Sequence, residues 1–244
     1  MKSRVYRDRI EINSDNTRTF YDQRAKSIKN RQQEYTTVLL GDQDPDYAVK
    51  WNEYEKGFIL PKLNITEQSR VLDLGCGMGR WADALDGKCH YYCGVDFSSE
   101  MIKLAEGRNR NGEFWFSQMS VADALADHEV IGEHYDIIIM TGVSMYINDR
   151  ELAECYLGFQ NVASVNPLVY LEESVGKEQR LTLNHIWSDN LGDYYGAIYR
   201  TREEYLELLR SNIRSLDIVE EGYMDVLDKE EQSETSHWYA LFHI

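Results

Sequence analysis

From Arg70 onwards the chain shows short apolar runs, each followed by a turn and then by a stretch with helical spacing. The apolar runs predict strands at residues 71–74, 91–95, 114–116, 135–140 and 168–172. Helical spacing falls between them, at residues 79–86, 99–107 and 150–164. Strands that alternate with helices form a doubly wound parallel sheet, and such sheets bind ligands at the carboxyl ends of their strands.

The segments that flank this core have patterns of their own. Residues 16–40 and 46–60 carry apolar positions three and four apart, which predicts two N-terminal helices ending near Pro61. Two further strands are expected at residues 217–223 and 238–244. Between the fifth strand and these closing strands lies an excursion, residues 174–212, rich in Tyr, Trp and Asn.

Long excursions between core strands usually act as lids or recognise substrates, although this one could also be a structural cover for the sheet. Within it, residues 201–209 are expected to form a helix, because Thr201 stands three residues before Glu204 in a capping-box spacing.

The sequence therefore predicts one α/β domain over residues 1–244 with a Rossmann-like sheet of seven mostly parallel strands. Only three prolines occur and no linker or repeat interrupts the chain, which favours a single domain. Its expected parts are an N-terminal helical cap at 1–63, a cofactor-binding core at 64–173, a lid at 174–212 and closing strands at 213–244.

The net charge of the chain limits the classes of partner that it is expected to bind. The chain of 244 residues has 26 Lys and Arg against 42 Asp and Glu, a formal net charge of −16, which disfavours nucleic acid as a partner. Residues 1–31 differ, with nine basic and four acidic groups. We see no apolar leader, and the most apolar stretch, residues 135–147, is too short and polar to cross a membrane. We therefore expect a cytoplasmic protein without a membrane partner, whose four cysteines are reduced.

The strongest chemical signal is a strand that turns through Gly75, Gly77 and Gly79 into a helix. Glycines let the backbone approach a ligand closely and adopt conformations that a Cβ forbids. A second strand ends in Asp96, where an acid accepts hydrogen bonds from the two hydroxyls of a ribose, so the ligand is expected to be an adenosine derivative.

The spacing of the glycines and an additional acid argue against a dinucleotide. A dinucleotide site reads G-x-G-x-x-G, whereas the third glycine here comes one residue early and position 80 is Arg. Asp73, directly before the loop, would repel a pyrophosphate but suits a cation such as the α-ammonium of a methionine.

With these motifs the sequence resembles the class I S-adenosylmethionine-dependent methyltransferases over roughly residues 20–244. DLGCGMG at 73–79 resembles their first motif, GVDFSSEM at 94–101 their second and YDIIIM at 135–140 their fourth strand. FYDQRA at 20–25 and IYRT at 198–201 resemble members that methylate small molecules and tailor sugars.

The resemblance implies S-adenosylmethionine as cofactor and S-adenosylhomocysteine as product. It implies that Asp73 orients the methionine ammonium and that Asp96 holds the ribose. Asp123 falls slightly later than the acid usual after the third strand. The residues implied to contact the cofactor are Tyr21, Asp73, Gly75, Cys76, Gly77, Asp96, Phe97, Met101, Met119, Ser120 and Met140.

A hydroxyl acceptor benefits from a general base, and candidates are sought on loops near the strand ends. His185 is preferred on chemical grounds because its ordinary pKa lies near neutrality, and Tyr146 is a candidate to position the acceptor. Glu172 and Glu173, at the end of the fifth strand, are further candidates. Arg24 and Arg200 are candidates to hold an anionic acceptor, although surface ion pairs would explain either one.

The leading hypothesis is methyl transfer by in-line displacement to a small-molecule or glycan-precursor acceptor, at a hydroxyl ahead of nitrogen. Two alternatives stay open, an amine N-methyltransferase and a non-catalytic subunit that binds the cofactor for a partner. No metal is expected, because the stretch after the fourth strand, Thr141-Gly-Val-Ser-Met145, lacks the neighbouring acids of catechol-type enzymes. The oligomeric state cannot be inferred from the sequence.

Overall fold

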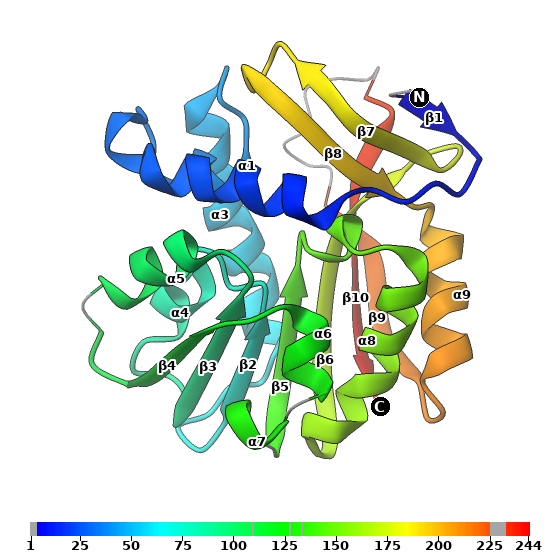
Figure 1. The fold of residues 1–244 in the computed structure, drawn as a ribbon. Helices are drawn as coiled ribbons and strands as arrows, with labels where there is room; N and C mark the ends of the chain where they lie inside the picture. The colour runs from blue at the N-terminus through cyan, green and yellow to red at the C-terminus, as the bar shows by residue number, and fades with distance from the viewer. Residues whose placement is uncertain (1–3, 109, 127, 133, 225–232) are drawn as a thin grey trace.

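A computed structural model of the chain describes residues 4–108, 110–126, 128–132, 134–224 and 233–244. Its main sheet has seven strands in the order β4-β3-β2-β5-β6-β10-β9 (Figure 1). In chain order their bounds are β2 Arg70–Leu74, β3 Tyr91–Asp96, β4 Glu113–Gln118, β5 Tyr135–Thr141, β6 Ala163–Gly176, β9 Asp217–Tyr223 and β10 Thr235–His243.

The main sheet confirms the predicted fold class. Strands β2 to β6 pair in parallel, and β10 is antiparallel to both of its neighbours, β6 and β9. The central strands are buried on both faces, which explains why their sequences read as continuous apolar runs rather than as alternating patterns.

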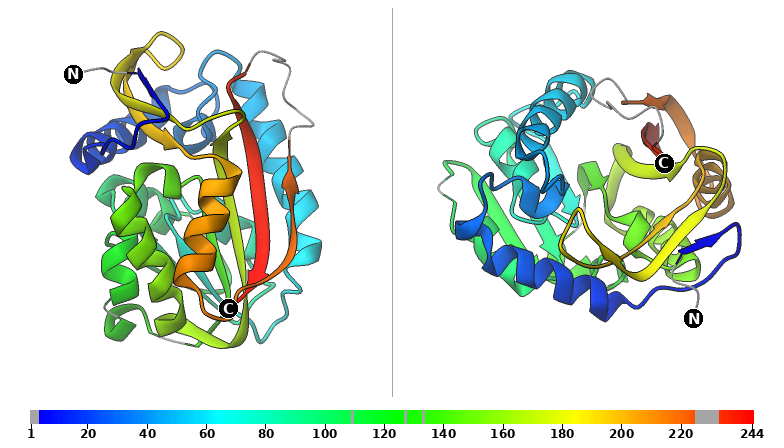
Figure 2. Two further views of the ribbon diagram at one scale, coloured as in Figure 1. Left: turned by 90° about the vertical axis from the view of Figure 1, so that its right-hand side faces the viewer. Right: turned by 90° about the horizontal axis from the view of Figure 1, so that it is seen from above.

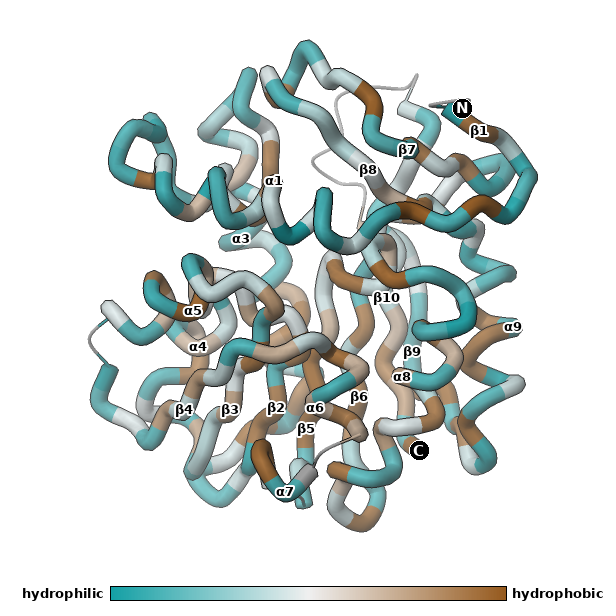
Figure 3. Tube along the Cα trace, in the orientation of Figure 1, coloured by the Kyte–Doolittle hydropathy of each residue, from teal (hydrophilic) through white to brown (hydrophobic). Residues whose placement is uncertain are grey.

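Helices cover the two faces of the main sheet (Figure 2). On one face, α6, α8 and α9 pack around a large apolar cluster with β5 and β6, and on the other α3 and α4 pack around Trp51, Trp81 and Tyr170. In Figure 3 the hydrophobic colour recurs along β5 and β6. The helix bounds are α3 Pro45–Ile59, α4 Arg80–Leu85, α5 Ser99–Glu106, α6 Val121–Ala126, α7 His128–Ile131, α8 Asp149–Val162 and α9 Arg202–Asn212.

A second, three-stranded antiparallel sheet lies above the carboxyl ends of the main strands (Figure 1). It consists of β1 (Arg4–Tyr6), β7 (Leu181–Ser188) and β8 (Asp193–Tyr199), with β7 in the centre. The sequence predicted an excursion here but neither the hairpin nor β1, because the edge of this small sheet is completed by a segment about 175 residues away. Helix α9 begins at the predicted Thr201, whose capping box is present.

The structure corrects the single helix expected over residues 16–40. Helix α1 (Ser14–Lys26) ends at Ser27, and the chain resumes as the short helix α2 (Thr36–Leu39), which Leu40 ends in a left-handed conformation. Within the break, residues 29–34 read KNRQQE, so no apolar position there packs on the core to continue the helix. Within the described ranges, no helix is both long and apolar enough to cross a membrane.

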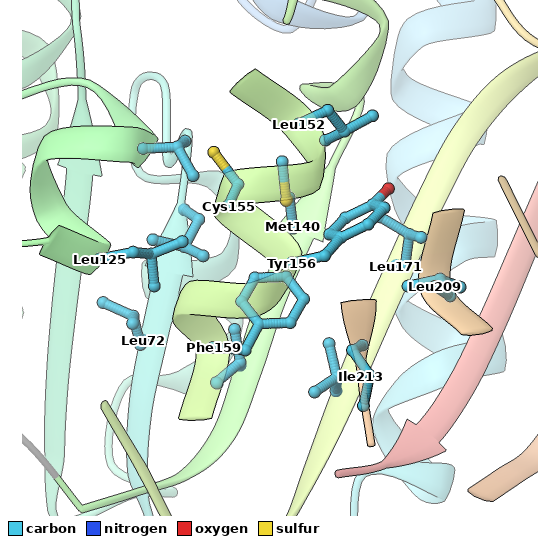
Figure 4. Packing of buried hydrophobic residues seen from close by; sticks show 14 of the residues in the cluster. Leu72, Leu125, Met140, Leu152, Cys155, Tyr156, Phe159, Leu171, Leu209 and Ile213 are labelled. Carbon is cyan, nitrogen blue, oxygen red and sulfur yellow. The ribbon is translucent and has the colours of Figure 1, made fainter. Parts of the chain in front are cut away.

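The core on the α8 face generates a test of the fold. Phe159 is fully buried on α8 among Leu72, Leu125 and Ile213 (Figure 4). We expect Phe159→Ala to lower the free energy of unfolding by about 3–5 kcal/mol, because it removes buried apolar area and leaves a cavity. Chemical denaturation followed by circular dichroism measures this change.

The neighbouring Leu157 provides a matched control on the same helix, since its side chain is 49% exposed. Leu157→Ala should change stability by no more than about 0.5 kcal/mol. Equal losses for the two variants would contradict the described orientation of α8.

Candidate active site

A cavity of about 570 Å³ opens at the carboxyl ends of β2, β3 and β5, between the main sheet and α1. This is the edge at which doubly wound sheets bind ligands. Residues predicted to contact a cofactor line the cavity, and their contact with it stays a prediction: Tyr21, Asp73, Gly75, Cys76, Gly77, Asp96, Phe97, Met101, Met119 and Ser120.

The glycine loop forms the floor of this cavity. The main-chain N–H groups of Gly75 and Cys76 both donate to the carbonyl of Val95, at 2.8 and 2.9 Å, which fixes the loop against β3. Gly75 has φ +81°, and a Cβ built on it would lie 2.2 Å from a methyl carbon of Val143. A larger residue at position 75 would therefore be strained and would collide with the turn after β5.

Asp96 is held beside the glycine loop in a defined orientation. Its carboxylate accepts hydrogen bonds from the N–H groups of Gly77 at 3.0 Å and of Ser98 at 2.8 Å. Ser98 in turn caps α5 by accepting from the N–H of Met101. Burial raises the pKa of Asp96 to about 6, against the lowering effect of the two N–H groups. The acid predicted to hold a ribose is thus placed at the end of β3 and faces the cavity.

Asp73 is the more deeply buried of the two acids, with 1% of its surface exposed. The hydroxyl of Tyr92 donates to its carboxylate. Burial raises the pKa of Asp73 to about 7, although this hydrogen bond and the charge of Arg80 lower it. A buried carboxylate with so little compensation favours a cationic ligand, as the sequence predicted.

The loop after β4 brings Ser120, a predicted cofactor contact, together with Asp123, the acid that falls later in the sequence than usual. Ser120 donates its hydroxyl to the carboxylate of Asp123 at 2.7 Å, and both residues line the cavity. The signal in the sequence is the spacing S-x-x-D, which is typical of a helix start and brings the acid back beside the loop.

Tyrosine hydroxyls from α1, the turn after β5 and β8 meet beside the cavity. Tyr21 on α1 donates to Tyr146 at 2.7 Å, and Tyr146 lies 2.8 Å from the hydroxyl of Tyr195 on β8. Burial raises the pKa of all three hydroxyls, so they are neutral at physiological pH. A neutral phenol can donate a hydrogen bond to a bound molecule or accept one from it, and it adds no charge to the site.

The turn that carries Tyr146 is held by two buried ionic side chains. The carboxylate of Glu173 accepts hydrogen bonds from the N–H groups of Val143, Ser144 and Met145, at 2.6 to 3.2 Å. Arg200 donates to the carbonyls of Ser144 and Ile147, at 2.8 and 2.6 Å. Glu173, a candidate base from the sequence, is therefore used to fix the turn.

The structure corrects the prediction that Arg24 and Arg200 hold the acceptor. Arg200 is fully buried and pairs with Asp149 at 2.7 Å, and Arg24 is 3% exposed and pairs with Asp42 at 2.8 Å. Neither lines the cavity, because each guanidinium is used on carboxylates and main-chain carbonyls. The cavity is instead lined by Arg18, one turn before Tyr21 on α1, whose side chain is 45% exposed.

Two further predictions are corrected by the packing. His185 lies at a bulge in β7 with φ +52°, stacks on Tyr194 and is exposed outside the cavity. Met140 is fully buried in the core, and the next residue, Thr141, lines the cavity because side chains alternate along a strand. In the described part of the chain, no group of three or more His, Cys, Asp or Glu could hold a metal.

Comparisons with known proteins agree with this geometry. A family model described as a methyltransferase domain matches residues 71–164. Phosphoethanolamine N-methyltransferase 3 of Arabidopsis thaliana is 27% identical over 157 residues, which cover 64% of this chain and 30% of that protein. Phosphoethanolamine N-methyltransferase 1 of Caenorhabditis elegans is 24% identical over 169 residues, which cover 67% of this chain and 34% of that protein. The chain thus spans about a third of the length of these relatives.

A solved structure extends the likeness to the whole fold. Phosphoethanolamine N-methyltransferase 1 of Haemonchus contortus, in complex with phosphoethanolamine and S-adenosylhomocysteine, superposes with a TM-score of 0.72 at 18% identity. The superposition covers 94% of this chain and 48% of that one.

The position of Asp96 generates a test of cofactor binding. We expect Asp96→Ala to weaken S-adenosylhomocysteine binding by about tenfold to a hundredfold, because two ribose hydroxyls lose a charged acceptor. Isothermal titration calorimetry measures this affinity. Glu106→Ala, at an exposed position at the end of α5, serves as the control and should bind like the wild type. Unchanged binding by Asp96→Ala would contradict the predicted role.

The raised pKa values of Asp73 and Asp96 generate a second test. Their ionised forms are the ones that would bind an ammonium and a ribose, and burial moves ionisation to about pH 7 and about pH 6. Affinity for S-adenosylhomocysteine should therefore rise with pH, by about tenfold per pH unit for each of the two carboxyl groups that is still protonated. Above about pH 7 the affinity should level off. Titrations at a series of pH values check this, and affinity that falls as the pH rises would contradict it.

The family model spans the segment that contributes the glycine loop, Asp73, Asp96 and the turn before Tyr146. Outside that segment, the main sheet adds the antiparallel β10 and its neighbour β9, and the superposition covers 94% of this chain. Local motif, cavity and fold thus agree: residues 71–164 match a methyltransferase domain, and the whole chain has the fold of the class I S-adenosylmethionine-dependent methyltransferases.

Proposed function

We propose that this chain transfers the methyl group of S-adenosylmethionine to a small polar acceptor enclosed beneath the lid. The observation that carries the proposal is the cavity itself, which continues from the acids at Asp73 and Asp96 to the side chains of Tyr21, Tyr146 and Glu172. Its volume of about 570 Å³ lies within the usual range for small-molecule sites. The net charge of −16 disfavours a nucleic-acid acceptor in addition.

The cofactor and the acceptor would occupy different ends of this cavity. The glycine loop, Asp96 and Phe97 would hold the adenosine and methionine parts, with the sulfonium directed away from Asp96. The acceptor would then lie between the Tyr21–Tyr146 pair and the end of β6. Methyl transfer is an in-line displacement with a good leaving group, so alignment by these side chains supplies much of the rate.

Nitrogen is favoured over oxygen as the acceptor atom, which reverses the order of the sequence hypothesis. With His185 outside the cavity, no imidazole among the described residues lines it to activate a hydroxyl. Glu172 lines it instead and is 5% exposed, and a buried carboxylate attracts a cationic amine. The named activity of the relatives from A. thaliana and C. elegans, N-methylation of phosphoethanolamine, supports the same choice.

An anionic group on the acceptor is supported by Arg18 at the cavity, where the guanidinium pairs with the exposed Asp15. An arginine can exchange such a surface partner for a phosphate at little cost, because exposed ion pairs are weak. Arg18 thus takes the place of Arg24 and Arg200 in the proposal. A hydroxyl acceptor is the second candidate, since Glu172 would serve as its base as well.

Two compounds that differ in one group separate these acceptors. Phosphoethanolamine and 2-hydroxyethyl phosphate share the phosphate and the carbon chain and differ in an amine or a hydroxyl. With methyl-labelled S-adenosylmethionine and the isolated chain, we expect label in the amine and little in the hydroxyl compound. Transfer to the hydroxyl compound alone would reverse the choice, and binding of S-adenosylhomocysteine without transfer to either would contradict this acceptor class and favour a non-catalytic role.

The tyrosine pair generates a further prediction. Tyr146→Phe should lower kcat with the transferred acceptor by about tenfold, since it removes hydrogen bonds worth about 1–2 kcal/mol near the acceptor. Affinity for S-adenosylhomocysteine should be preserved, because the variant leaves unchanged the carboxylates of Asp73 and Asp96 that would hold it. Steady-state kinetics give both values. His185→Ala, which changes an exposed side chain outside the cavity, should leave kcat unchanged, and a loss there would bring the lid histidine back as a candidate.

A further inference from the structure

A carboxylate on β6 and an imidazole on β10 are paired beside the cavity. Glu172 on β6 lines the cavity, and its Oε1 lies 2.9 Å from Nδ1 of His237 on β10. The ring of His237 packs against Trp51 of α3, with ring centroids 4.0 Å apart, and its side chain is 26% exposed. The imidazole therefore supports the carboxylate from behind while the carboxylate faces the cavity.

Other charged groups nearby are already engaged. Glu55 on α3 accepts from Arg80 of α4 at 2.5 Å and from the hydroxyl of Tyr170 at 3.0 Å. Arg80 donates also to Asn52 at 3.2 Å. The carboxylate of Glu173 is occupied by the turn after β5. Of these three acids, Glu172 is the one that lines the cavity.

The environment of Glu172 suits a proton acceptor. Burial and the nearby charge of Glu55 raise its pKa, while the hydrogen bond from His237 and the charge of Arg80 lower it. Burial makes a carboxylate more basic than one in water, and the hydrogen bond with the imidazole favours its ionised form and orients it.

An amine acceptor needs such a group because it arrives protonated. An alkylammonium has an ordinary pKa near that of lysine, about 10.4, and its nitrogen has no free electron pair to attack a methyl group. The adjacent sulfonium of the cofactor would lower the pKa of the ammonium, which makes proton transfer to a buried carboxylate easier.

We propose that Glu172 is the general base of this site and that His237 is its positioning residue, an inference that rests on the proposed amine acceptor. The Glu172 carboxylate takes one proton from the ammonium, which leaves a neutral amine. The nitrogen electron pair then forms the bond to the methyl carbon as the carbon–sulfur bond breaks, and its electrons neutralise the sulfonium to give the thioether of S-adenosylhomocysteine. The methylated ammonium leaves, and Glu172 releases its proton to water.

The test uses the pH profile of methyl transfer to phosphoethanolamine by the full chain. Glu172→Gln should lower kcat/KM by about a hundredfold near pH 7, within the range for loss of a general base. Its activity should recover at alkaline pH, where solution supplies the neutral amine. A structural defect would give no such recovery, and S-adenosylhomocysteine titration checks that the cofactor end is intact.

Variants of His237 separate positioning from packing. His237→Ala should lose about tenfold in kcat near pH 7 and shift the acid limb of the profile, and His237→Gln, whose amide can still donate to Glu172, should recover part of the loss. The control is His243→Gln on the same strand, where Nδ1 lies 2.9 Å from the carbonyl of Pro167, and it should behave like the wild type.

The possible failures are distinguishable. If the wild type binds S-adenosylhomocysteine but methylates no phosphoethanolamine, the proposed amine acceptor is wrong and this inference loses its basis. If the wild type methylates phosphoethanolamine and Glu172→Gln keeps its rate and its pH profile, the acceptor stands and the role of Glu172 is overturned. A His237→Ala variant identical to the wild type would overturn the positioning role alone.

Discussion

The turn from Val143 to Ile147 is the element on which the geometry of the site depends. Glu173 accepts hydrogen bonds from the N–H groups of this turn, and Arg200 donates hydrogen bonds to its carbonyls. Both kinds of main-chain polar group in this short irregular segment are therefore bound by side chains. Both ionic side chains are buried, where each hydrogen bond is strong and each missing partner is costly. This turn also places Val143 against Gly75 and Tyr146 against Tyr21, which joins the glycine loop to α1.

The acidic side chains of this molecule fall into two groups, one on the surface and one buried around the cavity. Most of the excess acids lie on the surface, but Asp73, Asp96 and Glu172 are buried around one cavity. Each buried carboxylate is costly unless something compensates it, and the compensation inside the protein is partial. A site built this way gains most from a ligand that supplies an ammonium, a sulfonium or hydroxyl donors.

The residues predicted to contact a cofactor came together at one cavity because their placement depends on local sequence. Gly75, Cys76 and Gly77 lie within three consecutive positions, and Asp96 follows one βα unit later, so strand order and the glycine conformations place them together. Met140 was misplaced by one residue, which turns a side chain to the opposite face of a strand. The break between α1 and α2 was missed although residues 29–34, KNRQQE, offer no apolar position to continue a helix.

The end of the cavity that we propose for the acceptor could not be predicted in the same way, because the side chains there come from distant segments of the chain. Arg24 and Arg200 have the right charge for an anionic ligand, yet Asp42 and Asp149, brought near by the fold, occupy them. His185 has suitable chemistry but lies exposed at a bulge in β7 and does not line the cavity. Glu172 was one candidate among several, and its pairing with His237, 65 residues later, is visible only in the sheet register.

The sequence by itself determined the sheet, the glycine loop and the acids expected to hold the cofactor, since short-range spacing encodes each of them. The tertiary structure decided which candidate side chains face the cavity. Long-range pairing settles whether a charged group is satisfied by the protein or left for a ligand, and no local pattern contains that information.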